Sequence, residues 1–375
     1  MTPRLTPEAE TEELRRVVRG FLAKHTGTAG VLREPARSQG WDAEVWRRLA
    51  VELGVAALDV PEDLGGAGAS FREVGIVAEE LGRCLVRLPW FSTAVLGVGV
   101  LLHTAGAGET HRTLLDRLAT AEATATLAYR EEFDGGPAGA VATEAIEAAD
   151  GWRLTGTKTL VVEGTTADVL FVVARDPAGT SIYVVDGAAD GLRRTAMPTL
   201  DPTRPLARLV LDRVPAVRLG RAGAAPIAVQ RVLDRARAAL ACEQVGGAAA
   251  AMELSVAHAS SRVQFGRPIG TFQAIKHRCA DMALLLDSAR SAALWAVAAA
   301  ADDGGELPLA ATTAALACAD AYTWISAETV QVHGGMGFTW EHPAHLHVRR
   351  AATGAVLFGT GNDHRERLLD LLEVR

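Results

Sequence analysis

The sequence has few cysteines and no long run of basic residues. Among its 375 residues, four cysteines lie far apart in apolar, alanine-rich surroundings: Cys84, Cys242, Cys279 and Cys318. Neither a disulfide framework nor a CxxC motif fits this spacing, so we expect buried thiols in a reducing compartment. The net charge is −7, and the basic surface that a phosphate backbone requires is lacking. We therefore expect no nucleic-acid partner.

Long apolar runs are also missing. The longest, near residues 94–102, is well short of the roughly 18 residues that a membrane span needs, and residues 1–10 are polar and acidic. We therefore expect a cytoplasmic protein with no membrane partner. Hydrophobic residues make up 49% of the chain and charged residues 22%, a balance typical of packed globular proteins. At this length, two or three packed units are expected.

The apolar periodicity changes twice along the chain. Helical spacing runs to about residue 120, short β-branched segments follow, and helical spacing returns after Pro226. The expected strands include residues 169–174, 181–185 and 207–211, and the expected late helices are roughly 226–260, 271–302 and 307–333. We predict an α+β multidomain fold with an N-terminal helical domain (1–122), a middle antiparallel β domain (123–224) and a C-terminal four-helix bundle (225–375).

Two glycine- or arginine-bearing turns need separate interpretation. The cluster Leu64-Gly65-Gly66-Ala67-Gly68 follows no strand, so we interpret it as a loop between helices rather than a phosphate-binding loop. Residues 261–277 (SRVQFGRPIGTFQAIKH) form a Gly/Pro turn between two long helices. Chemistry alone allows an anion site built on an arginine and a helix N-terminus, or simply a capped helical hairpin.

The segment 261–277 closely resembles the bundle hairpin of acyl-CoA dehydrogenases, with its RxxFG and following FQ. By this resemblance Arg262 binds the pyrophosphate of FAD at a subunit interface, and Gln264, Phe265 and Gln273 also contact the cofactor. A second segment, residues 331–338 (QVHGGMGF), resembles the QxxGGxGF of that family, which assigns FAD contacts to Gln331 and Gly335. Further similarity in residues 53–68, 155–158 and 167–168 extends the resemblance over nearly the whole chain.

The resemblance implies a flavoprotein oxidoreductase of lipid metabolism. Its reaction is the FAD-dependent α,β-dehydrogenation of an acyl thioester carried on CoA or a carrier protein. The expected partners are the thioester substrate, an electron-transfer flavoprotein or similar acceptor, and other chains in a homotetramer or heterotetramer.

The base that takes the substrate α-proton is missing from both usual positions. Residues 357–362 (LFGTGN) align with the YEGT segment of the family, so Thr360 and Asn362 keep FAD contacts while Phe358 replaces the glutamate. Phe has no proton acceptor. The alternative position of the family, 29 residues before Phe265, is Ala236. Arg237 follows it and matches the substrate-side arginine, although a solvated helix charge beside Arg231 and Arg235 is an alternative.

Glu243 is the carboxylate that we select as a candidate base. It lies seven residues after Ala236, about two helical turns along the same face. Its neighbours in sequence, residues 239–251, carry no other charge, and burial in an apolar face favours a base that works near neutrality. The alternative is that Glu243 only forms hydrogen bonds within the bundle or at a subunit contact.

Other differences from the family pattern leave two alternative functions open. Residues 129–136 replace the TEPxxGSD-like stretch that approaches the flavin in the family. Divergent chains of this type resemble subunits of actinobacterial heteromeric members, so a non-catalytic partner subunit is one alternative. A flavin-dependent monooxygenase on the same fold, which needs no α-proton base, is the other. His342, His345 and His347 lack ligand partners at metal spacing, so we expect no metal site.

Overall fold

The computed structural model describes residues 9–25, 40–104, 108–132, 141–302 and 304–373. They divide into two units that interleave along the sequence. The first unit takes in residues 1–38, 71–87 and 237–375, and the second takes in residues 39–70 and 88–236. The predicted boundaries of the three domains stay predictions.

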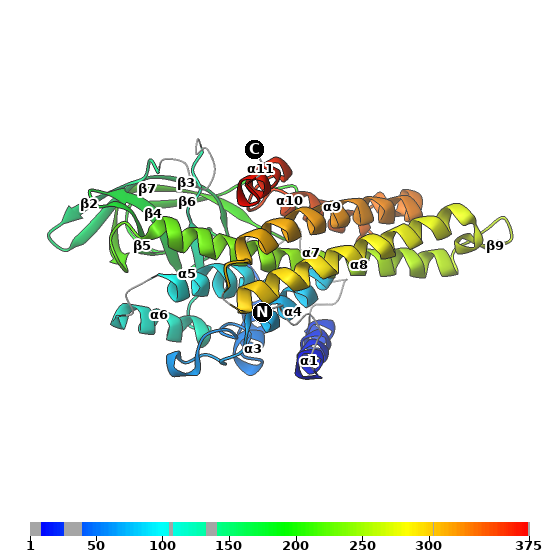
Figure 1. The fold of residues 1–375 in the computed structure, drawn as a ribbon, viewed down its shortest axis with the longest axis horizontal. Helices are drawn as coiled ribbons and strands as arrows, with labels where there is room; N and C mark the ends of the chain where they lie inside the picture. Colours follow the sequence, from blue (N-terminus) through cyan, green and yellow to red (C-terminus); the bar gives the residue numbers. More distant parts are fainter. Residues whose placement is uncertain (1–8, 26–39, 105–107, 133–140, 303, 374–375) are drawn as a thin grey trace. The chain divides into compact units, whose positions relative to one another are not determined.

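Long helices build the first unit (Figure 1). They are α1 (Ala9–His25), α4 (Phe71–Cys84), α7 (Ala225–Ser261, from Arg237 onward), α8 (Gln273–Ala301), α9 (Leu307–His333), α10 (Ala344–Gly354) and α11 (Gly361–Leu371), with 3-10 turns η4 (Ile269–Thr271) and η5 (Gly334–Phe338). The three long helices predicted in the last third of the chain are confirmed to within two residues at each end. Short connections make α7, α8 and α9 successive antiparallel neighbours.

Glycines set the distances between these helices. A Cβ on Gly82 of α4 would lie 2.0 Å from the backbone oxygen of Glu243, and one on Gly246 of α7 would lie 1.8 Å from that of Glu79. The two helices therefore touch backbone to backbone at a crossing that only glycine permits. On α7, a Cβ on Gly247 would lie 2.5 Å from the phenol ring of Tyr322 in α9. Glu243 is buried because it lies within this close packing.

The helix α8 corrects one prediction. By length and composition it is apolar enough to cross a membrane, whereas the sequence was expected to contain no such segment. Small apolar residues interrupted by single charges produce this property without a continuous apolar run. In the bundle, α8 packs against α4 and α9, and 44% of its most apolar window is buried.

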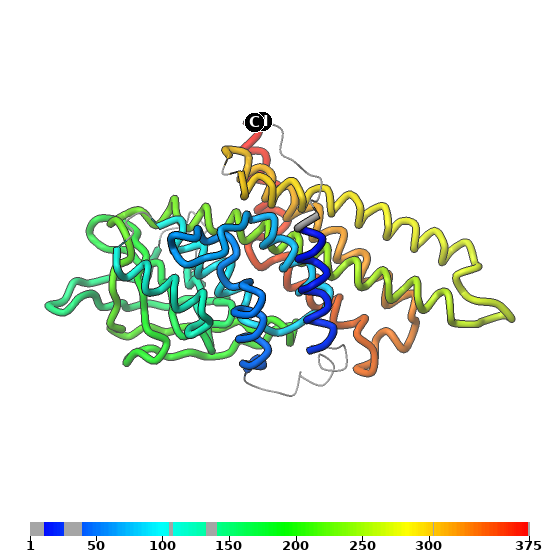
Figure 2. The backbone as a smooth tube through the Cα atoms, turned by 90° about the horizontal axis from the view of Figure 1, so that it is seen from below, coloured from blue at the N-terminus to red at the C-terminus, as the bar shows by residue number. Residues whose placement is uncertain are grey.

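A short hairpin joins α7 to α8 at one end of the bundle (Figures 1 and 2). Its strands are β8 (Val263–Gln264) and β9 (Arg267–Pro268), which pair antiparallel across a two-residue turn.

The second unit combines short helices with a sheet. Its helical elements are α3 (Ala43–Glu52), the 3-10 turn η2 (Glu62–Leu64), the π-helical η3 (Phe91–Gly97), α5 (Val98–His103), α6 (Glu109–Ala119) and the start of α7. The predicted loop at residues 64–68 is confirmed, and Gly65 and Gly68 have φ of 85° and 63° there. These left-handed angles explain the two glycines.

Among the described residues of the second unit, seven strands form one sheet. They are β1 (Ala125–Ala128), β2 (Glu144–Ala148), β3 (Gly151–Val162), β4 (Val169–Asp176), β5 (Gly179–Asp186), β6 (Leu192–Ala196) and β7 (Leu206–Leu219). The three expected strand segments are confirmed. The pairings β4–β2, β2–β3, β3–β7, β7–β5 and β5–β4 return to β4, so these five strands close into a ring. Closure removes most exposed strand edges.

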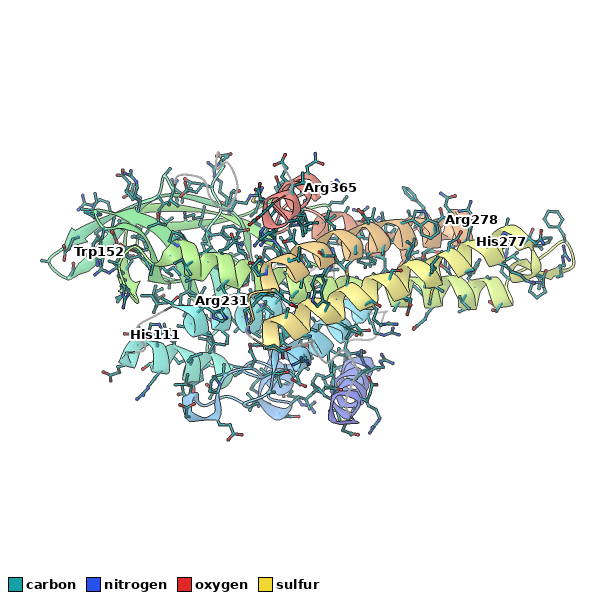
Figure 3. All side chains as sticks on the ribbon, viewed as in Figure 1. His111, Trp152, Arg231, His277, Arg278 and Arg365 are labelled. Atoms are coloured by element: carbon teal, nitrogen blue, oxygen red, sulfur yellow. The ribbon has the colours of Figure 1, made fainter. Side chains whose placement is uncertain are left out.

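The prediction of an antiparallel sheet holds for most pairs but is wrong for two. The strand β1 joins β4 in parallel, and β2 meets β4 in parallel at one residue pair. Period-two patterning indicates which residues are buried but not the direction of the neighbouring strand. The core inside the sheet is aliphatic with one aromatic side chain, Tyr183, against which Trp152 packs at 5.4 Å between ring centroids (Figure 3).

Candidate functional site

Arg237 fixes the loop in which the family glutamate is replaced. Its Nε and Nη2 donate to the backbone oxygen of Phe358 at 3.1 and 2.9 Å. Arg237 is 3% exposed and Phe358 is 4% exposed. The alternative of a solvated charge is therefore wrong for Arg237. The guanidinium therefore ties α7 to the backbone of the loop between α10 and α11, and its two hydrogen bonds do not involve the side chain at 358.

A recess in the first unit surrounds this contact. Its volume is about 10 Å³, roughly the space that one water molecule needs. Its lining residues come from α7, α9, α10, the loop into α11 and α11 itself: Arg237, Leu240, Gln244, Ala315, Gly354, Ala355, Phe358 and His364. A Cβ on Gly354 would lie 3.0 Å from Nε2 of Gln244, which keeps the end of α10 close to α7. None of these described lining residues is a carboxylate.

Glu243 forms a buried ion pair instead of lining the recess. Its Oε1 accepts from Nη1 of Arg350 on α10 at 2.8 Å, and both residues are 5% exposed. The sequence predicted an apolar helix face around Glu243, because residues 239–251 carry no other charge. The structure instead places a guanidinium from a distant part of the chain against it. Its role as the base stays a prediction, and the ion pair favours the alternative of a structural contact within the bundle.

Six of the predicted FAD contacts lie at the hairpin end of the bundle. Arg262, Gln264, Phe265 and Gln273 belong to the hairpin and the start of α8, and Gln331 and Gly335 to the end of α9 and η5. All six are solvent-exposed, and Phe265 is 91% exposed. A Cβ on Gly335 would meet nothing within 4 Å, so the backbone there is open to a ligand. Figure 3 shows His277 and Arg278 on the neighbouring part of α8.

The other two predicted contacts lie at the start of α11. Thr360 is the N-cap, and its hydroxyl and backbone amide pair with the carboxylate of Asp363 in a capping box. Oδ1 of Asn362 accepts from Arg365 at 3.3 Å (Figure 3). Both predicted residues are at least partly exposed. They follow Phe358 closely and so lie near Arg237, at the opposite end of the first unit's part of α7 from the hairpin.

The length of α7 separates the two groups. Arg237 and Ser261, the last residue before the hairpin, are 24 residues apart on this helix, which at 1.5 Å per residue is about 36 Å. This is more than an extended dinucleotide spans. The hairpin group has exposed polar and aromatic side chains, and the group at the start of α11 has exposed polar side chains.

Sequence reasoning missed a stack of histidines beside the hairpin. The rings of His258 and His333 are 4.4 Å apart and nearly parallel, and those of His333 and His342 are 4.3 Å apart. Burial, with His333 and His258 as further causes, lowers the pKa of His342 to about 4. His345 packs edge-on against Trp340, and His347 lies 2.9 Å from the hydroxyl of Tyr322. Within the described residues, no three His, Cys, Asp or Glu side chains converge as a metal site.

A buried ion pair in the second unit holds the segment that departs from the family pattern. Oε1 of Glu131 accepts from Nζ of Lys158 at 2.6 Å and from the hydroxyl of Thr143 at 2.6 Å, and Oε2 accepts from the amide of Ala142 at 2.7 Å. Burial raises the pKa of Glu131, but these hydrogen bonds outweigh it and lower the pKa to about 2. Residues 133–136 of that segment lie outside the described residues.

Two acyl-CoA dehydrogenase family models match most of the chain. The N-terminal domain of acyl-CoA dehydrogenases matches residues 8–122, and the C-terminal domain matches residues 226–372. Acyl-CoA dehydrogenase IpdE2 of Mycobacterium tuberculosis is 34% identical over 367 residues, covering 97% of this chain and 98% of that protein.

Two solved structures extend this similarity to the fold. One is a variant of the Tcur3481-Tcur3483 steroid ACAD, with 32% identity, a TM-score of 0.86, and coverage of 97% of this chain and 98% of that chain. The other is the ChsE4-ChsE5 complex from Mycobacterium tuberculosis, with 25% identity, a TM-score of 0.89, and coverage of 99% of both chains. The predicted fold class is confirmed. So is the flavin prediction, because FAD is the cofactor of the matched family. The chain belongs to the acyl-CoA dehydrogenase family of flavoprotein oxidoreductases.

Proposed function

We propose that this chain is one subunit of a heteromeric acyl-CoA dehydrogenase, in which a homologous chain supplies the base. This proposal rests on one observation, the residues that stand at the two positions where family members carry the base. Phe358 and Ala236 are both buried and apolar, and neither side chain accepts a proton. The nearby carboxylate of Glu243 is held by Arg350.

The reaction of the assembly is the α,β-dehydrogenation of an acyl-CoA. Bound FAD supplies the acceptor for the β-hydride. This chain contributes residues that position the cofactor. Arg237 orders the loop at Phe358, which leads into Thr360 and Asn362. The hairpin presents Arg262 and Phe265. An arginine is suited to a pyrophosphate, because its planar guanidinium makes paired hydrogen bonds to phosphate oxygens.

Sharing of the cofactor between chains supports a multimeric assembly. The hairpin group and the Thr360 group are about 36 Å apart along one bundle, as the rise per residue of α7 requires. One FAD molecule that contacts both the hairpin group and the Thr360 group therefore contacts one group on each of two chains. In such an assembly a chain without a base still completes the cofactor site of a chain that has one.

The relatives support a partner that is not identical to this chain. Two similar solved structures are each named for two different proteins, Tcur3481 with Tcur3483 and ChsE4 with ChsE5. We further propose a cytoplasmic location, an electron-transfer flavoprotein as the electron acceptor, and acyl-CoA rather than carrier-bound substrates. Similarity to a steroid ACAD makes acyl-CoA esters with steroid-derived side chains the first substrate class to assay.

Co-expression tests the proposal. The chain is produced alone and together with a homologous chain from the same genome that has Glu at the position of Phe358 or Ala236. We expect the pair to copurify with FAD and to bleach its flavin on addition of acyl-CoA, whereas this chain alone does not. A homomer of this chain that bleaches its flavin at the same rate as the pair would refute the proposal.

A further inference from the structure

The turn of the hairpin between α7 and α8 is strained. Phe265 and Gly266 are its two turn residues, with φ of 52° and 75°. Two successive positive φ values are typical of a type I′ turn, which favours Asn-Gly or Gly-Gly. A bulky aromatic residue at positive φ is unfavourable, so another interaction must stabilise Phe265 in this conformation.

Two side chains from the base of the hairpin provide that interaction. The guanidinium carbon of Arg267 lies 4.2 Å from the ring centroid of Phe272. The ring of Phe272 in turn meets that of Phe265 edge-on, at 6.1 Å between centroids and 86° between planes. Both geometries are favourable, the first as a cation–π contact and the second as a T-shaped aromatic pair. Phe272 therefore lies between Arg267 and Phe265.

The base of the hairpin is rigid enough to carry this arrangement. The amide of Ile269 donates to the oxygen of Arg262 at 2.8 Å, and the amide of Arg262 donates to that of His258 at 2.8 Å. A Cβ on Gly270 would lie 2.9 Å from the oxygen of Ala259, so the base packs directly on the last turn of α7. The ring of Phe265 nevertheless stays 91% exposed. The contacts orient this ring without covering it.

We propose that Arg267 and Phe272 are positioning residues, which hold the exposed ring of Phe265 ready to stack on a planar heteroaromatic ring of the FAD that a neighbouring chain holds. This inference rests on the proposed sharing of FAD between chains. Pre-ordering of a strained turn lowers the entropic cost of binding, because the ring is already in place before the cofactor arrives. Arg267 and Phe272 thus affect FAD affinity through Phe265.

FAD affinity of the intact assembly tests the inference. The dissociation constant is measured by titrating FAD into the apo-assembly and following flavin fluorescence, and the melting temperature is recorded alongside. We expect Phe272→Leu to weaken FAD binding about 5- to 10-fold, the loss expected for one aromatic pair and one cation–π contact. The matched variant Phe272→Tyr keeps the ring and should stay within about twofold of the unmodified protein.

A double-mutant cycle separates positioning from a general structural role. Phe265→Asn removes the ring but tolerates the left-handed conformation, so FAD binding weakens while the melting temperature is kept. In that background, Phe272→Leu should cause no further loss. Equal FAD affinity of Phe272→Leu and the unmodified assembly, or a loss that adds fully to that of Phe265→Asn, overturns the inference alone. An unmodified assembly that binds no FAD overturns both the inference and the proposed function.

Discussion

Nη1 of Arg350 donates to Oε1 of Glu243 at 2.8 Å, and this buried pair joins α10 to α7. A carboxylate that accepts from a buried guanidinium is stabilised in its charged form and anchored in place. Such a group holds the helix that leads into the Phe358 loop.

Changing Glu243 alone should therefore reduce stability without affecting flavin reduction. We expect Glu243→Gln to lower the free energy of unfolding by about 3 kcal/mol, since it removes the charge of Glu243 from a buried ion pair with Arg350. Urea denaturation measures the loss. The double variant Glu243→Leu/Arg350→Met is the control and should recover most of it, because an apolar pair of similar volume needs no charge partner.

The same Glu243→Gln variant tests whether Glu243 is the catalytic base. In the folded heteromeric assembly, acyl-CoA should bleach the flavin of Glu243→Gln as fast as that of the unmodified protein. Bleaching slowed by a factor of about 100 or more, the typical contribution of a general base, would instead identify Glu243 as the base.

Restoring the family carboxylate should create a base in this chain. Arg237 holds the backbone oxygen at position 358 through two hydrogen bonds, and these contacts do not involve the side chain at that position. We expect Phe358→Glu to give acyl-CoA-dependent bleaching in protein that is otherwise inactive and supplied with FAD. Phe358→Gln is the matched control, which has the same size but no basic oxygen. If neither variant gains bleaching, the loop is not oriented toward substrate.

Glu131 should make the second unit sensitive to acid. Its pKa is lowered to about 2 in the folded chain from a usual value of 4.5. The stabilisation is therefore complete above about pH 4.5 and is lost as the pH falls towards 2. We expect Glu131→Gln to be less stable at pH 7 by about 3 kcal/mol and to show a flatter decline over this window. Glu132→Gln, at the exposed neighbouring carboxylate, should change stability by less than about 1 kcal/mol.

His347 should contribute a second acid transition. Burial first, and then the charge of Arg350, lowers the pKa of His347 from 6.5 to about 3. Because the unfolded chain binds a proton that the folded chain does not, stability falls as the pH drops from 6.5 towards 3. The slope expected from one such group is about 1.4 kcal/mol per pH unit. His347→Gln should remove this slope, whereas His277→Gln, at an exposed position on α8, should leave it unchanged.

Much of the fold could be predicted because local sequence patterns determine its helices and strands. Helical periodicity and Gly/Pro breaks placed α7, α8 and α9, and β-branched runs placed β4, β5 and β7. The partners of buried charges were not predictable in this way. Arg350 is 107 residues from Glu243, and only the tertiary fold brings the two helices together. The parallel pairing of β1 with β4 and the histidine stack were missed for the same reason.

The candidate site also combines features that local sequence predicts with features that only the tertiary fold determines. Motifs with a fixed spacing identified the hairpin residues from the sequence. They also showed that Phe358 stands where the family has its glutamate base. The role of Arg237 as a donor to the loop, and that of Arg267 in orienting Phe265 through Phe272, depend on distances that no motif encodes.

The most direct test of the central claim is the subunit composition and acyl-CoA response of the purified flavoprotein. Native mass spectrometry gives the composition, and anaerobic addition of acyl-CoA gives the bleaching rate of the same preparation. We predict a tetramer that contains this chain and a homologous chain with a base, and that bleaches its flavin. A homotetramer of this chain alone that is yellow and bleaches at the same rate would contradict the account.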